Sequence, residues 1–190
     1  MTMANVPVTT VVDADVYGGI EGFLLAYSVP TLKNDGRHVI PSYVNDQTLP
    51  PDGGDFCVVN PVTATRRGTN VEAWKRKADD DTLDYLEYLE TTWQIDCYSA
   101  SPVRAMRMAT TLETTIRSPV GVAFFRPKSI DCLFADAPIN LSGLLDSGKY
   151  VSRWQLTAHF GYWKKVTVKS EYFDSLRINV VNVDSAFPPQ

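Results

Sequence analysis

The sequence lacks the marks of several common functional classes. It has no run of about 18 or more apolar residues, the length that a membrane-spanning helix requires, and its start has neither the basic residues nor the apolar block of a signal peptide. Walker, GxGxxG and GxSxG motifs are also absent. Lys and Arg number 18 against 22 Asp and Glu, and the net charge of -4 argues against general nucleic-acid binding. We therefore expect a soluble protein, made in the cytoplasm, with no membrane partner.

Cysteine and histidine are scarce. The three cysteines, Cys57, Cys97 and Cys132, form no CxxC pair and lie in or beside apolar runs, so we expect buried free thiols. The two histidines, His38 and His159, share no ligand spacing with cysteines or carboxylates. The sequence accordingly predicts no metal site, no cofactor and no catalytic residue.

Two enzymatic interpretations were weighed against this expectation. Cys97, His159 and Asp96 contain the residue types of a nucleophilic triad, but neighbours on a strand point to opposite faces, so Asp96 and Cys97 would not orient the same imidazole. The clustered carboxylates Asp79, Asp80, Asp81 and Asp84 could bind a divalent ion, yet they lack EF-hand spacing, and a solvated acidic loop is the expectation. An enzyme would have to use this loop together with His159.

The sequence does contain the composition of an ordinary globular protein. Hydrophobic residues make up 44% and charged residues 21% of the chain, which leaves enough apolar side chains for a sizeable core. A length of 190 residues fits one core of common size. We expect a single domain over residues 1–190, with an N-terminal arm at 1–12 and a C-terminal tail at 185–190.

The stretch from Tyr85 to Arg117 predicts a long strand followed by an amphipathic helix. Apolar and polar residues alternate in the strand, with the period of two that a half-buried strand shows. Ser101 and Pro102 suit a helix start, and Pro119 suits its end. The predicted buried positions of the strand are Leu89, Thr91, Trp93, Ile95 and Cys97, and those of the helix are Val103, Met106, Ala109 or Thr110, Leu112 or Glu113, and Ile116.

Further elements flank this unit. A first helix begins at Asp13 or Asp15, and 55–62 is a buried strand that Asn60 and Pro61 close. The remaining predicted strands lie at 38–44, 120–125, 129–135, 150–169 and 176–183. A continuous strand over 150–169 would span about 60 Å at ~3.3 Å per residue, so either a turn near Gly161 breaks it or part of it projects. This order favours an α+β fold, a largely antiparallel sheet covered on one face by two main helices, with projecting loops or hairpins and extended arms.

Basic residues gather between the strands at 55–62 and 85–98. Arg66 and Arg67 come first, and Lys75, Arg76 and Lys77 follow directly before the acidic run. Such a stretch predicts a solvated loop or hairpin. A sharper hypothesis is a projecting loop that meets another subunit or lines a passage.

Three strings resemble the neck and tail terminator proteins of long-tailed bacteriophages. DFCVVNPVTATRRGT (Asp55–Thr69) is a strand that ends in Asn-Pro before a variable hairpin. WQIDCYSASPVRAMRMATTLETTIRS (Trp93–Ser118) leads from a strand into an alanine- and threonine-bearing helix. GKYVSRWQLTAHFGYWKKVTV (Gly148–Val168) repeats a Tyr-x-x-Arg strand with alternating aromatics. The resemblance covers roughly residues 13–183, and the loop at 33–52 and the charged segment 66–84 depart from the family pattern.

The resemblance implies a structural virion protein of the phage neck. It implies a homo-oligomeric ring, a hexamer, that caps the tail tube, ends tail polymerisation and joins the tail to the head connector, and that also meets the sheath if the tail is contractile. DNA would pass through the lumen without specific binding. Loops of family members point to the lumen, which makes Arg66, Arg67 and Lys75–Lys77 candidates for a lumen or axial contact. The central helix, which carries Arg104 and Arg107, or the first helix is the candidate for the contact between subunits.

Two other functions fit the same residues less well. A head-side adaptor or head completion protein would also form a ring, but it would assemble on the portal without tube. An orphan enzyme would require the acidic loop and His159 to act together.

Overall fold

The computed structural model describes residues 8–9, 13–28, 38–42, 54–75, 82–144 and 150–169. Their elements follow in the order β1 (Val8–Thr9), α1 (Asp13–Phe23), the π-helical turn η1 (Leu24–Ser28), β2 (Val39–Pro41), β3 (Phe56–Arg66), β4 (Val71–Lys75), β5 (Thr82–Ser99), α2 (Pro102–Ile116), α3 (Pro119–Phe125), the 3₁₀ turn η2 (Arg126–Lys128), β6 (Ile130–Ala135), β7 (Ile139–Asn140), β8 (Gly143–Leu144) and β9 (Tyr150–Lys169).

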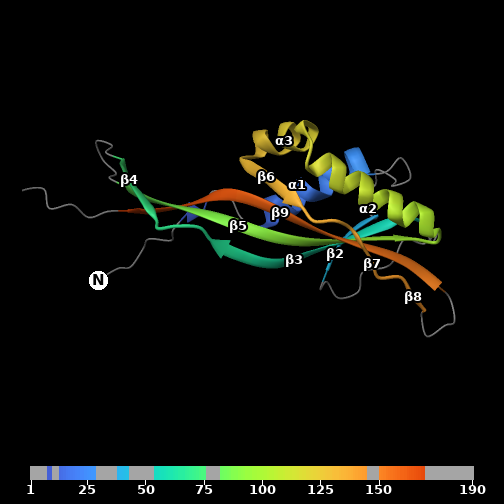
Figure 1. The fold of residues 1–190 in the computed structure, drawn as a ribbon. Helices are drawn as coiled ribbons and strands as arrows, with labels where there is room; N and C mark the ends of the chain where they lie inside the picture. The colour runs from blue at the N-terminus through green and yellow to red at the C-terminus, as the bar shows by residue number, and fades with distance from the viewer. Residues whose placement is uncertain are drawn as a thin grey trace, which may run out of the picture.

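The fold is α+β, as the sequence predicts, with helices on one face of a mostly antiparallel sheet (Figure 1). Its centre is the antiparallel pair β5 and β9, which is in register from Thr82↔Lys169 to Ser99↔Ser152. β3 pairs with the other edge of β5, and β6 and β7 pair with the other edge of β9. Only β2 pairs in parallel, with β3. The helical layer contains α3 in addition to the two predicted helices.

Alternation along the central strands places the core between the sheet and the helices. Trp93 and Ile95 of β5 are buried on the helical face, as are Leu156 and Phe160 of β9. Polar residues occupy the other face, so the predicted alternation of both strands is confirmed. A half-buried strand of this kind is stabilised chiefly by the apolar area that its inner side chains remove from water.

Helix α2 buries a different stripe from the predicted one. Its buried residues are Ala105, Met108, Ala109, Leu112 and Ile116. Val103 and Met106 are instead 64% and 47% exposed, so the prediction is wrong for the first two turns. The sequence permits both stripes, because small or apolar residues occupy positions 103, 105, 106, 108 and 109. Packing of α2 against β9 and β5 selects the stripe with the two alanines, whose small side chains let the helix approach the sheet.

Residues 120–125 form a helix, not the predicted strand. Ser118 accepts a hydrogen bond at its hydroxyl from the Val120 amide (3.2 Å), and Pro119 occupies the first helical position. Gly121 allows α3 to approach the end of α2, since a Cβ there would lie 2.6 Å from the Ile116 carbonyl oxygen. Phe125 fills the core beside Phe160, with ring centroids 4.9 Å apart. An N-cap and a helix-starting proline therefore outweigh the β-propensity of this apolar run. The adjoining prediction, a strand at 129–135, is confirmed by β6.

β3 does not end at Asn60 and Pro61 as predicted. It continues to Arg66 through a register shift between Pro61 and Thr63. Pro61 has no amide hydrogen to donate, and this part of β3 has no partner strand on its outer edge among the described residues, so the bulge accommodates the proline without loss of a ladder bond.

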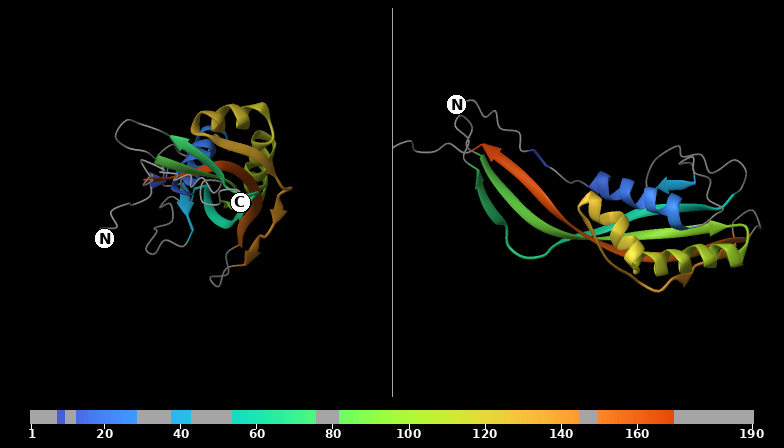
Figure 2. Two further views of the ribbon diagram at one scale, coloured as in Figure 1. Left: turned by 90° about the vertical axis from the view of Figure 1, so that its left-hand side faces the viewer. Right: turned by 90° about the horizontal axis from the view of Figure 1, so that it is seen from above.

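The long strands project beyond the helices as an arm, which we define as β4, residues 82–89 of β5 and residues 162–169 of β9. The right-hand view of Figure 2 shows these strands running past the helical layer. β9 is continuous through Gly161, so of the two predicted alternatives the projecting strand is confirmed and the turn is wrong. β1 pairs with the arm at Thr167 and Val166, which confirms the predicted edge strand at Val8–Thr9.

Several predictions lie outside the described residues. They concern the rest of the N-terminal segment 1–12, the acidic run Asp79–Asp81, the strand at 176–183 and the C-terminal tail at 185–190.

Substitutions at Ile95 and Met106 distinguish the buried stripe from the exposed one. Ile95→Asp should abolish cooperative unfolding, because an unpaired buried carboxylate costs several kcal/mol against a typical total stability of about 5–15 kcal/mol. Met106→Asp should change the free energy of unfolding by no more than about 0.5 kcal/mol, as surface substitutions usually do. Urea unfolding followed by circular dichroism measures both. Equal loss of structure in the two variants would contradict the assignment of the stripe.

Replacing Gly161 should destabilise the protein, because the Tyr88 ring occupies the space that a side chain at position 161 would need. A Cβ at this position would lie 2.6 Å from Tyr88 Cζ, so Gly161→Ala must displace the ring and break its hydrogen bond to Asp131. We expect a loss of roughly 1–3 kcal/mol in urea unfolding.

Gly143→Ala provides the matched control, because a Cβ there meets no atom within 4 Å. In a Tyr88→Ala background, Gly161→Ala should be nearly neutral. A full loss in that background would show that Tyr88 is not the cause.

Candidate interaction surfaces

The arm carries exposed apolar residues and one buried ion pair. Asp84 is buried within it, accepts a hydrogen bond from Thr167 Oγ1 at 2.6 Å and lies 3.3 Å from Lys165 Nζ. These contacts join β5 to β9 where no helix covers the strands. Trp74 and Trp163 are about half exposed (52% and 50%). Large apolar side chains at a projecting edge are typical of a contact surface.

Arg66 braces the junction of β3 and β4. Its Nε donates to the Gly68 carbonyl oxygen at 2.9 Å, and its Nη2 donates to Asn70 Oδ1 at 2.8 Å. Nε also lies 3.2 Å from Glu87 Oε1 of β5. Gly68 has φ +96°, a left-handed conformation that glycine adopts without strain, so this turn depends on glycine. Arg66 thus lies at the base of the arm, away from its tip.

Arg67 begins a row of contacts on the uncovered face of the sheet. It donates through Nε to Glu90 Oε2 at 2.7 Å, and this hydrogen bond lowers the pKa of Glu90 and raises that of Arg67. Glu90 Oε1 lies 3.7 Å from His159 Nδ1, and His159 Nε2 lies 3.6 Å from Asp136 Oδ2. The His159 ring stacks on Phe134, with centroids 4.0 Å apart. This row links the strand junction, β5, β9 and the end of β6.

The hypothetical catalytic triad of Cys97, His159 and Asp96 does not form. Cys97 lies on the helical face with its sulfur 3.8 Å from that of Cys57, whereas His159 lies on the uncovered face. Asp96 accepts hydrogen bonds from Gln94 and Arg153, both at 2.9 Å. The hydrogen bond with Cys97 and burial raise the pKa of Cys57 well above its usual range, which keeps the thiol protonated. All three cysteines are free, as predicted, and Cys132 is only half-buried.

Thr92, His159 and Asp136 form a second group of a hydroxyl, an imidazole and a carboxylate, and its distances are also long. Thr92 Oγ1 lies 3.4 Å from His159 Nδ1, and Asp136 lies 3.6 Å from the other ring nitrogen. Both distances exceed the ~2.6–3.2 Å of a working proton relay, so the row fits cross-strand bracing better than catalysis. Within the described residues no three His, Cys, Asp or Glu side chains gather as metal ligands would. The described helices include none long and apolar enough to cross a membrane.

Four exposed residues at the start of α2, Val103, Arg104, Met106 and Arg107, form what we call the α2 patch. Arg104 lies 3.5 Å from Asp55 and donates to Ser99 Oγ at 3.3 Å, whereas Arg107 makes no ion pair within the described residues. The first turn of α2 has no acidic residue, and a helix N-terminus favours anions over cations. Two arginines here cost the helix some stability. The patch is therefore suited to an acidic partner with apolar side chains.

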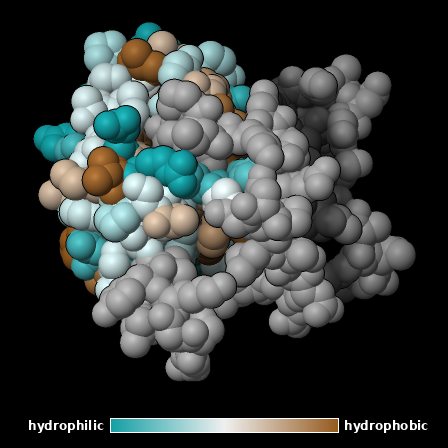
Figure 3. Space-filling view, turned by 90° about the vertical axis from the view of Figure 1, so that its right-hand side faces the viewer, coloured by the Kyte–Doolittle hydropathy of each residue, from teal (hydrophilic) through white to brown (hydrophobic). Residues whose placement is uncertain are grey.

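The remaining predicted contact residues are the cations Lys75, Arg76 and Lys77. Lys75 ends β4, and its side chain lies outside the described residues, as do Arg76 and Lys77. In the sequence, Arg76 and Lys77 directly follow the last residue of β4. In Figure 3, which views the molecule from the end where β5 passes into α2, hydrophobic residues on the described surface occur as separate patches among polar ones.

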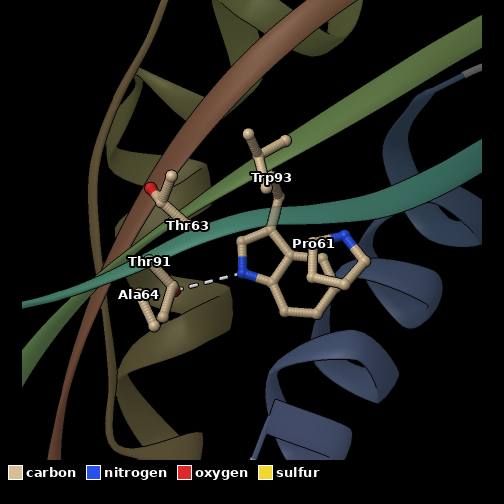
Figure 4. A pocket seen from close by; sticks show the side chains of 6 residues that line it. Pro61, Thr63, Ala64, Thr91 and Trp93 are labelled. Atoms are coloured by element: carbon tan, nitrogen blue, oxygen red, sulfur yellow. Dashed lines mark hydrogen bonds between the residues drawn. The ribbon is translucent and has the colours of Figure 1, made fainter.

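A hollow of about 150 Å³ lies at the β3 bulge, a feature that sequence patterns did not indicate. It is lined by Pro61, Val62, Thr63, Ala64, Thr91 and Trp93. Figure 4 shows the Trp93 indole beside the Pro61 ring, with its nitrogen donating to Thr91 Oγ1 at 3.1 Å. The hollow is a tertiary feature, because it requires a register shift in β3 opposite a large residue of β5. Pro61 was the only signal for it in the sequence.

Taken together, these features define a one-sided α+β protein with a projecting arm, whose candidate functional features are contact surfaces. The family of phage neck terminator proteins matches residues 14–187, and the chain therefore belongs to that family. The predicted resemblance is thus confirmed. None of the curated proteins matches the chain. The family assigns it a structural role in the phage neck, within the virion tail.

Glu90→Gln should test the row on the uncovered face through its pH dependence. The folded-state pKa of Glu90 is lowered from its ordinary value of 4.5, so its contribution to stability is present above that value and is lost as the pH falls through the folded pKa. The urea midpoint of the variant should lie below that of the wild type at pH ~7, and the difference should vanish in acid.

Glu72→Gln, at an exposed position on β4, is the control and should show no such pH-dependent difference. A Glu90→Gln difference that stays constant between neutral and acidic pH would contradict the role of the ionised carboxylate.

Proposed function

We propose that six copies of this chain form a closed ring that caps the tail tube, ends tail polymerisation and joins the tail to the head connector. The observation that carries this proposal is the family match over residues 14–187, on a fold with no assembled catalytic group among the described residues. A ring of heterologous contacts buries its side surfaces on itself and leaves two axial faces for other partners. Such a protein acts by shape and needs no cofactor.

The proposed contacts divide between the arm and the helical layer. Lys75, Arg76 and Lys77, at the end of the arm, contact the lumen or an axial partner. Arg66 and Arg67 are bound to Glu87 and Glu90 at the base of the arm, so we assign them to bracing and to the sides of the subunit instead. The α2 patch contributes to the contact between subunits.

The wider assembly follows from the same proposal. One domain spans residues 1–190. The N-terminal segment 1–12 and the C-terminal tail 185–190 lie on neighbouring proteins. Tube protein and connector are the axial partners, and a sheath is a further partner if the tail is contractile. DNA passes through the lumen without specific binding.

Polymerising tube protein tests the proposal directly. Added ring should shorten or cap the tubes in electron micrographs, and Arg107→Glu should remain folded but fail to close rings or cap tubes. Arg126→Glu, which changes an exposed arginine beyond α3, is the matched control and should cap normally.

Wild-type rings that leave tube growth unchanged would contradict the proposal. If such rings bound the portal instead, the head-side adaptor would replace it.

A further inference from the structure

The two lateral edges of the sheet present different side chains. The strand order places β6 and β7 beyond β9 at one edge and β3 beyond β5 at the other. We call residues 61–67 the β3 flank and residues 131–141 the β6–β7 flank. They are separated by the full width of the β9–β5–β3 pairing, so they face away from each other.

The β3 flank is hollowed and ends in two arginines. It contains the hollow at the bulge, and Val62 beside it is 52% exposed. Arg66 and Arg67 end the flank and pair through Nε with Glu87 and Glu90 of β5, so their charge is partly offset within the subunit. A cavity of about 150 Å³ is large enough to hold benzene, so this hollow has room for a branched aliphatic side chain.

The β6–β7 flank carries exposed apolar side chains and two aspartates. Ile139 is 60% exposed, the largest exposed fraction among the apolar residues of this flank, and Leu133 and Leu141 are exposed beside it. Asp131 and Asp136 are the charged residues of the flank, and positions 129–144 contain no Lys, Arg or His. The flank therefore pairs exposed apolar groups with negative charge only.

Strand addition is not the mode of contact that these flanks favour. Pro61 has no amide hydrogen, and the bulge twists the outer edge of β3, two features that protect an edge strand from pairing with another chain. Side chains rather than backbone ladders must then make the contact.

We propose that the β6–β7 flank of one copy docks on the β3 flank of the next, with the Ile139 side chain in the hollow lined by Pro61, Ala64 and Trp93. Asp131 and Asp136 then lie opposite Arg66 and Arg67 of the neighbour, where opposite charge favours encounter and fixes the register. This inference rests on the proposed ring and names the surfaces that close it.

Ring closure follows from the placement of the two flanks. A contact between different surfaces on opposite edges is heterologous, so each copy uses both and the series closes when the rotation per copy divides a full turn. α2 packs against both β9 and β5, and Arg104 of the α2 patch contacts Asp55 and Ser99, so the patch lies at the end of the sheet where β3 begins and β5 ends.

Cysteine cross-linking tests the contact. A variant with Ala64→Cys and Ile139→Cys, treated with a short bismaleimide under assembly conditions, should give a ladder of covalent multimers that ends at the mass of the ring. All variants carry Cys132→Ser, because Cys132 is a half-buried thiol of the β6–β7 flank; the single variants should then give none, since Cys57 and Cys97 are buried. Ala64→Cys with Val122→Cys, which is also exposed but lies on α3, outside the proposed contact surfaces, is the matched control.

Assembly of a second variant provides an independent measurement. Ile139→Asp should stay monomeric in native mass spectrometry while its thermal unfolding midpoint matches the wild type, whereas Val122→Asp, an exposed change on α3, should still form rings.

The outcomes separate this inference from the proposed function. Wild-type rings of normal mass without the ladder, an equal ladder in the control, or rings formed by Ile139→Asp would each overturn the docking and leave the ring intact. A wild-type protein that remains monomeric at assembly concentrations would overturn both.

Discussion

The pairing of β5 with β9 is the constraint on which the rest of the structure depends. The two strands are hydrogen-bonded over the full length of β5, and every other strand of the main sheet attaches to one of them directly or through β3. Because the pair is longer than the helices that cover it, its outer part must stand free of the core. Gly161 permits this continuity, since Tyr88 occupies the space of a side chain there and bonds to Asp131 of β6. Burial, together with this hydrogen bond, raises the pKa of Tyr88 to about 12.

The helices cover one face of the sheet, so the side chains on the other face contact water and need to be polar. Here that face carries a row of polar contacts between Arg67, Glu90, His159 and Asp136, which crosses from one strand to the next. Each contact is worth little by itself in solvent, but together the contacts favour one register of the strands. Among the described residues, no further strand pairs with residues 61–67 of β3 on their outer edge or with the outer edge of β6 and β7. A subunit of this kind is suited to meet neighbours on its sides and other proteins at its ends.

Two of the wrong predictions have a common physical cause. At 103–109 and at 120–125 the sequence contains apolar residues compatible with more than one arrangement, and local propensity did not decide between them. Contact of α2 with β9 selected Ala105 and Ala109 over Val103 and Met106. At the second site, the Ser118 cap and the close approach that Gly121 permits selected a helix. The β3 hollow was missed because it arises between residues 61 and 93, which are far apart in the chain.

The sequence by itself determined the fold class, the alternation of the two central strands, the free cysteines and the family. These depend on periodicity, composition and local strings, which are properties of short stretches of chain. Only the tertiary structure decided which face of α2 is buried, that β9 runs straight through Gly161, that Arg66 and Arg67 are bound at the base of the arm, and that a hollow at the β3 bulge lies on the opposite edge of the sheet from Ile139. Each of these features depends on contacts between segments that are far apart in the sequence, and local sequence patterns do not determine such contacts.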